Sequence, residues 1–142
     1  MLVRLLYASR AAEAVTQELT EAILQSSRKH NPALGITGVL CYGGDVYMQV
    51  LEGGREAVNE LYNKIVRDER HRDIALLHYQ EVAERKFAGW TMGQVNLAKV
   101  NASLLLKYSD KAVLDPLATS GRESMALLEE LSATAQIVGR AG

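Results

Sequence analysis

The segment from Asp45 to Gly53, with the sequence DVYMQVLEG, constrains the fold of this chain most strongly. It is rich in residues that favour strands, and the glycine pair before it predicts a turn. Alternate side chains of a strand share a face, so both faces would be apolar apart from the amide of Gln49. A strand of this kind is usually central and covered on both sides. An unpaired buried amide costs about 1–3 kcal/mol, so we expect Gln49 to have a hydrogen-bond partner.

The rest of the chain alternates between further strand and helix patterns. Strands are predicted for Leu2–Ala8, Gly35–Tyr42, Ile74–Val82 and Trp90–Leu97. Helices are predicted for Ala11–Lys29, where His30-Asn31-Pro32 is expected to end the helix, and for Arg55–Asp68. Gly43 and Gly44 fit a two-residue hairpin turn. The order is β-α-β-β-α-β with a fifth strand, which predicts an α+β, ferredoxin-like fold with two helices on one sheet face.

The pattern changes near residue 98, so we expect a domain over residues 1–98 and a helical extension over residues 99–142. Helices are predicted for Ala102–Tyr108 and Ser124–Val138, the second opened by a capping box at Ser120. Because the helices of the domain cover one sheet face, this pair is expected to cover the other face or to bind a partner. Its exposed apolar positions favour a homo-oligomer, either a dimer or a larger ring.

The composition excludes several classes of protein. The chain has 142 residues and a net charge of −1, which argues against nucleic acid or an anionic membrane as a partner. It has no apolar run long enough to span a membrane and no pattern typical of a signal peptide, so a cytoplasmic location is expected. A lone cysteine and three histidines without ligand spacing predict no metal site.

Several polar residues would point into the space between sheet and helices. Tyr7 and Gln49 would lie on neighbouring strands of a ferredoxin-like sheet, where a phenol and an amide can satisfy one another. Met92 would share a face with Trp90 on the fifth strand. This pairing could be structural, with nothing else bound.

A binding site is the other interpretation of the same residues. Ile23 and Ile65 would face each other across a groove, with Asn31, Asp68 and Arg70 at the helix ends, so that a flat ring could lie between them. Nucleotide-binding glycine motifs and a serine triad are absent from the sequence. An enzyme of the acylphosphatase kind is disfavoured, because the turn after the first strand offers an arginine but no well-placed asparagine.

The chain resembles the BLUF domains, blue-light sensors that use flavin, over roughly residues 1–98. The resemblance lies in segments that occur in the family's order: Tyr7-Ala8-Ser9, Asn31-Pro32 through Gly35-Ile36-Thr37-Gly38-Val39-Leu40, Gln49-Val50-Leu51-Glu52-Gly53, Asp68-Glu69-Arg70-His71 and Trp90-Thr91-Met92. It implies noncovalent FAD between the two helices, with FMN or riboflavin as possible substitutes. Tyr47 stands where relatives often carry phenylalanine.

The resemblance also implies roles for individual residues. Asn31, Asp68 and Arg70 would lie at the pyrimidine edge of the flavin, and Ile23 and Ile65 would sandwich the ring. The remaining implied contacts, beside the ring, the ribityl chain or a phosphate, are His30, His71 and Lys64.

A light response follows from the same resemblance. Tyr7 would give an electron and a proton and recover them, and Gln49 would rotate or change tautomer. Trp90 or Met92 would carry the change to the extension, and a separate effector protein would receive it, as in short members of the family that are not enzymes themselves. The alternative is a ferredoxin-like protein-interaction module that has lost its flavin.

Overall fold

The strands form one twisted sheet in a computed structural model that describes residues 1–134 and 137. The strand order is β4-β1-β3-β2-β5, in which the β2–β5 pair is parallel and the other pairs are antiparallel. The bounds are β1 Leu2–Ala11, β2 Thr37–Gly43, β3 Val46–Gly54, β4 His71–Val82 and β5 Gly93–Asn96. The first four strands have the ferredoxin-like order, which confirms the predicted α+β fold.

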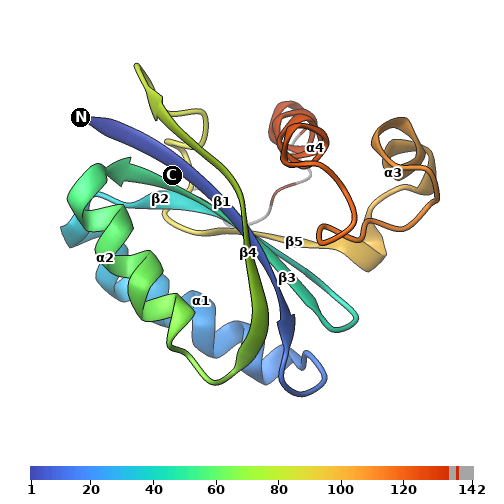
Figure 1. The fold of residues 1–142 in the computed structure, drawn as a ribbon, viewed down its shortest axis with the longest axis horizontal. Helices are drawn as coiled ribbons and strands as arrows, with labels where there is room; N and C mark the ends of the chain where they lie inside the picture. Colours follow the sequence, from blue (N-terminus) through green and yellow to red (C-terminus); the bar gives the residue numbers. More distant parts are fainter. Residues whose placement is uncertain (135–136, 138–142) are drawn as a thin grey trace.

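The helices divide between the two faces of the sheet, as Figure 1 shows. One face carries α1 (Gln17–Leu34) and α2 (Arg55–Val66), and the other carries α3 (Ala102–Tyr108) and α4 (Gly121–Ala133), with the 3-10 turn η1 (Leu97–Lys99) leading into α3. Two hydrophobic clusters correspond to these two layers. The C-terminal helices therefore cover the second sheet face, as predicted.

Strand β3 lies at the centre of the sheet, between β1 and β2. Its residues from Val46 to Gly53 are all buried, as expected for a strand with two apolar faces. Gln49 pairs with Tyr7 on β1 and with Leu40 on β2. A two-residue hairpin joins β2 and β3, but its turn is Gly44 and Asp45, one residue later than predicted, because Gly43 still pairs with Val46. Gly44 has φ 58°, in the left-handed region that favours glycine.

Helix α1 begins and ends later than the sequence predicts. Strand β1 continues to Ala11, and the helix starts after Thr16, whose hydroxyl accepts from the Leu19 amide at 3.1 Å. Pro32 lies inside the helix, so the prediction that it ends the helix is wrong. Proline removes a single donor from the last turn, and Gly35 at φ 68° then closes the helix.

The fifth strand is shorter than predicted, because it begins at Gly93 rather than at Trp90. Trp90 and Met92 precede it in irregular backbone, so strand alternation does not apply to them. Met92 belongs to the cluster beneath α1 and α2, and Trp90 to the cluster beneath α3 and α4. The prediction that they share a face is therefore wrong.

The cover of the second face begins where the capping box was predicted. The hydroxyl of Ser120 accepts from the Glu123 amide at 3.1 Å at the start of α4. Met125, Leu127, Leu128 and Leu131 of α4 are buried in the cluster beneath it. The helix ends at Ala133, with Thr134 after it in a turn, so the predicted end at Val138, itself outside the described residues, is too late.

Candidate cofactor site

A cavity of about 250 Å³ lies between the sheet and the helix pair α1 and α2. Ligand pockets are usually about 300–1,000 Å³, so this one suits the flat ring of a larger molecule whose remainder stays outside. Side chains from both helices, β1, β2, β3 and the start of β4 line it: Tyr7, Ile23, Ser26, Ser27, Leu40, Tyr47, Gln49, Leu61, Lys64, Ile65, Asp68, Arg70 and His71.

Tyr7 and Gln49 form the predicted pair in the wall of the cavity. The Tyr7 hydroxyl donates to Gln49 Oε1 at 2.6 Å, and the Gln49 Nε2 group donates to Met92 Sδ at 3.3 Å. All three side chains are buried. Burial is the main cause that raises the pKa of the Tyr7 phenol above its ordinary value, and the neighbouring Tyr62 adds to the effect. The phenol therefore stays protonated and acts as the donor of the pair.

Ile23 on α1 and Ile65 on α2 both line the cavity. Both are half-buried and pack against the apolar cluster that contains Tyr7. Lys64, next to Ile65, also reaches the cavity and is itself exposed. The structure therefore brings an apolar slot and a cation together at the open side of the site.

Asp68 and Arg70 form an ion pair at the rim of the cavity. Arg70 donates to the carboxylate of Asp68 through Nε at 3.0 Å and through Nη2 at 2.6 Å. These bonds hold the pKa of Asp68 below its ordinary value, and burial opposes the effect. The rim therefore presents a fixed pair of opposite charges to anything bound inside.

His71 joins α2 to the sheet beside the cavity. Its Nε2 lies 2.5 Å from the carbonyl oxygen of Ile65, and its Nδ1 lies 2.9 Å from Ser9 Oγ. A carbonyl oxygen only accepts, so Nε2 carries a proton and donates to it. His30, in contrast, is exposed and its ring is bonded to the Ser26 carbonyl. His71 lines the cavity and His30 does not.

Asn31 is buried near the end of α1, although it is not among the residues that line the cavity. Its Nδ2 group has no hydrogen-bond partner among the described residues. A buried amide without a partner is costly, so Asn31 suits a site in which a bound molecule supplies an acceptor. The Tyr47 hydroxyl likewise has no hydrogen-bond partner among the described residues, and Tyr47 lines the cavity.

Five lining residues were not identified as site residues from the sequence. Each has a periodic relation to one that was: Tyr47 is two residues before Gln49, Leu40 is its partner on β2, and Leu61 is one helical turn before Ile65. Ser26 and Ser27 lie one helical turn after Ile23 in the same way. Strand and helix periodicity therefore carried the signal that would have found them.

The donor set of the site suits an organic ring rather than a metal ion. No group of three or more metal-ligating side chains occurs among residues 1–134 and 137. Among these residues, no helix is both long and apolar enough to cross a bilayer. The slot between isoleucines, the buried amide and phenol groups and the charged rim fit a flavin, whose ring is flat and carries hydrogen-bonding groups on one edge.

Comparison with known proteins gives the same result. The family described as "BLUF: Sensors of blue-light using FAD" matches residues 2–93. A photoactivated adenylate cyclase subunit beta from Euglena longa is 36% identical over 92 residues, which are 64% of this chain and 11% of that subunit. The chain therefore spans about a tenth of this curated relative.

Two solved structures match nearly the whole chain. The photo-activated state of BlsA has a TM-score of 0.80 and 33% identity, covering 93% of this chain and 95% of BlsA. The dark state of BlrB, a BLUF protein, has a TM-score of 0.79 and 34% identity, covering 94% of this chain and 96% of BlrB. With the family match and the Tyr7–Gln49 pair, these likenesses show that the chain belongs to the BLUF family and is a blue-light flavin sensor.

Proposed function

We propose that the chain holds FAD noncovalently between α1 and α2 and reports its excitation by a hydrogen-bond change at Gln49. The observation that carries the proposal is the buried line of contacts from Tyr7 through Gln49 to Met92 beside the cavity. A bound flavin supplies the absorption of blue light and, once excited, a strong oxidant. FMN or riboflavin would suit the same site, since the cavity has room for the ring alone.

Residues from both helices and the sheet would hold the ring. Ile23 and Ile65 would lie against its two sides, and the Asn31 amide would bond to its polar edge. Asp68 and Arg70 would lie at the rim near that edge, while Lys64 would meet the phosphate-bearing part outside the slot. His71 would fix the end of α2 through its bond to the Ile65 carbonyl. His30 contributes least, because its ring is turned back onto α1.

The Tyr7–Gln49 pair can change its hydrogen bonds at small cost. The Gln49 Nε2 group donates to a thioether sulfur, which is a weak acceptor, so little energy holds the amide in this orientation. When Tyr7 gives up an electron and its proton, the donor to Gln49 Oε1 is lost and the amide is free to rotate or change tautomer. When the electron and the proton return to Tyr7, no net redox change remains. A new hydrogen bond of about 1 kcal/mol then biases the population of two states.

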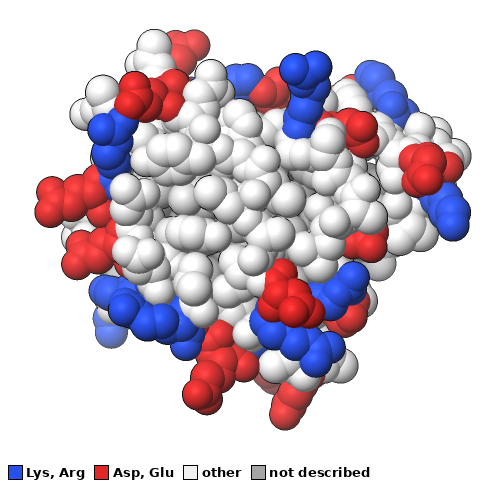
Figure 2. All heavy atoms as spheres, viewed as in Figure 1, with Lys and Arg blue, Asp and Glu red and all other residues white. Residues whose placement is uncertain are grey.

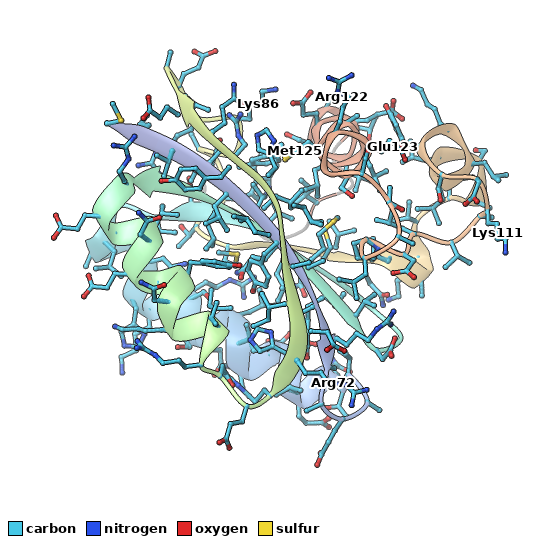
Figure 3. The ribbon with its side chains drawn as sticks, viewed as in Figure 1. Arg72, Lys86, Lys111, Arg122, Glu123 and Met125 are labelled. Carbon is cyan, nitrogen blue, oxygen red and sulfur yellow. The ribbon has the colours of Figure 1, made fainter. Side chains whose placement is uncertain are left out.

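The signal would leave the site through Met92. When Gln49 rotates, its contact to Met92 breaks, and Met92 lies two residues from Trp90 in the opposite core. Trp90 shares that core with Met125 of α4. The loop before Trp90 is also joined to α4 through an ion pair between Lys86 and Glu129, and Figure 3 shows Lys86 beside that helix. Residues 1–98 would thus be the sensor, and residues 99–142 the output element.

The exposed apolar surface of β4 and of the extension would bind a separate effector protein and a second copy of the chain. Figure 2 shows few charged side chains over the edge strand β4, and Leu76 and Tyr79 of this strand are exposed. In the extension, Leu106 and Val113 are exposed as well. Apolar surface beside an open strand edge favours protein partners. The cytoplasmic location expected from the sequence stays part of this proposal.

Absorption spectroscopy of three variants tests the mechanism. The wild type should purify with bound flavin and show a small red shift under blue light that reverts in darkness. Tyr7→Phe and Gln49→Leu should retain flavin and lose the red shift. Tyr62→Phe is the matched control, because the Tyr62 ring lies 5.7 Å from that of Tyr7 without bonding to Gln49, and it should keep the shift.

Two results would contradict the proposal. A colourless wild type that takes up no added flavin would favour the flavin-free interaction module. A red shift that survives in Gln49→Leu would remove the amide from the mechanism.

A further inference from the structure

Tyr47 presents a buried hydroxyl group to the cavity. Its side chain is 3% exposed, and it lines the same cavity as Gln49, two residues further along β3. Its hydroxyl oxygen has no hydrogen-bond partner among the described residues. Phenylalanine would fill the same volume without this polar atom, so the hydroxyl needs an explanation that packing does not give.

The charged groups near Tyr47 do not satisfy it. Asp68 and Arg70 influence its ionisation, but their polar atoms bond to each other at 2.6–3.0 Å. Burial raises the pKa of the Tyr47 phenol more than Arg70 lowers it, so the group is neutral and keeps its proton. The hydroxyl can therefore donate a hydrogen bond. Because no described protein group accepts it, a molecule in the cavity would supply the acceptor.

Other buried side chains without partners do not share this position. Thr20 and Ser124 also have unpartnered hydroxyls, but neither lines the cavity. Tyr42 is the register partner of Tyr47 on β2, and its hydroxyl donates to Gln94 at 3.5 Å, outside the cavity. The combination of burial, a missing partner and a place in the lining thus distinguishes Tyr47 from these residues.

We propose that the Tyr47 hydroxyl donates a hydrogen bond to the flavin ring, as a second phenol contact beside the Tyr7–Gln49 pair. This contact rests on the proposed function, since it needs the ring in the cavity. It stabilises the flavin-bound state, because no protein group among the described residues bonds to this hydroxyl. Tyr47 therefore couples the stability of the fold to occupation of the site.

The test is Tyr47→Phe in the full chain, with Tyr42→Phe as the matched control. Riboflavin and FAD are titrated into each flavin-free protein, and urea unfolding is measured without flavin. Tyr47→Phe should weaken flavin binding about fivefold to tenfold, as for loss of a buried hydrogen bond. Its urea midpoint without flavin should match that of the wild type, because no protein group among the described residues bonds to the hydroxyl. Tyr42→Phe should bind flavin like the wild type.

The outcomes separate this contact from the proposed function. Flavin affinity of Tyr47→Phe within twofold of the wild type overturns the contact and leaves the sensor mechanism in place. Weaker binding together with a lower urea midpoint also overturns it, because the hydroxyl would then stabilise the flavin-free fold. A wild type that binds neither riboflavin nor FAD overturns both.

Discussion

At the centre of β3 the two faces of the sheet are filled differently, although this strand contributes to both. Met48 and Val50 are buried in the cluster on the side of α3 and α4. Tyr47 and Gln49 point to the other side, where a cavity separates the sheet from α1 and α2. A hollow also borders Val46 at the end of the strand, but Met48 and Val50 do not line it. One strand thus contributes to an apolar core on one side, called the closed face below, and to a polar site on the other, called the open face. Alternation along a strand is sufficient to build both.

The polar groups of β3 and of the cavity show the same difference. On the closed face, the Glu52 carboxylate accepts from Arg4 at 2.8 Å and from the amides of Lys86 and Phe87 at 2.9 and 2.7 Å. On the open face, the Tyr47 hydroxyl and the Asn31 Nδ2 group have no partner among the described residues. Satisfied polar groups stabilise a fold, whereas unsatisfied ones are typical of a binding site. Ser124 of α4 also has an unpartnered hydroxyl, but it does not line the cavity, so the difference concerns the cavity and not the whole of each face.

The largest expected effect is that of Glu52→Ala on the closed face. Arg4 is 5% exposed and Glu52 is fully buried, so the change leaves a buried guanidinium without its partner. Removing one partner of a buried pair costs about 3–5 kcal/mol of unfolding free energy. Urea unfolding measures the loss, and hydrogen exchange should show faster exchange of the Lys86 and Phe87 amides.

The control for this variant is Glu81→Ala, which removes the partner of Arg55 in an exposed pair on the outside of the sheet. Exposed pairs contribute about 0.2–1 kcal/mol, so this change should be small. Equal losses of unfolding free energy in Glu52→Ala and Glu81→Ala would contradict the claim that burial makes the Glu52 pair the more important of the two.

Leucine and isoleucine truncations compare the two faces directly. Leu128 is fully buried in α4, so Leu128→Ala should cost about 2–5 kcal/mol of unfolding free energy with or without flavin. Ile65 is half-buried beside the cavity, so Ile65→Ala should cost less than about 1 kcal/mol without flavin. It should instead weaken flavin binding, which a fluorescence titration measures. A larger loss of stability for Ile65→Ala than for Leu128→Ala would remove the contrast between the faces.

The features of the site that follow from periodicity were predictable from the sequence. The alternation in β3 predicted which side chains share a face, and the ferredoxin-like order predicted that Tyr7 and Gln49 would be neighbours. The slot between Ile23 and Ile65 followed from helical spacing. These relations depend on local geometry, which tertiary packing leaves unchanged in regular elements.

Features outside the regular elements were not predictable in this way. Trp90 and Met92 are two positions apart, yet they enter opposite cores because the strand begins only at Gly93. The backbone there is fixed by the bond from the Gly38 amide to the Trp90 carbonyl, at 2.9 Å, which is a long-range contact. The missing partner of Tyr47 likewise depends on every atom around it. Such features require the packed structure.

The smallest expected effect concerns the charged rim of the open face, where pH changes the contribution of Asp68. The bonds from Arg70 lower the pKa of Asp68 in the folded chain below its unfolded value of about 3.9. A lowered pKa means that the ion pair stabilises the fold above the unfolded pKa and loses this effect as the pH falls through the folded pKa. The side chain of Arg70 is 50% exposed, so the contribution at pH 7 is at most about 1 kcal/mol.

Asp68→Asn should therefore lower the unfolding free energy of the flavin-free chain at neutral pH. The difference from the wild type should shrink as the pH falls below about 4, where the wild-type carboxylate begins to take up its proton. Urea unfolding at a series of pH values measures both curves, and high salt should reduce their separation at neutral pH. A separation that stays constant down to acid pH would contradict this and would mean that Asp68 acts through the shape of its side chain rather than through its charge.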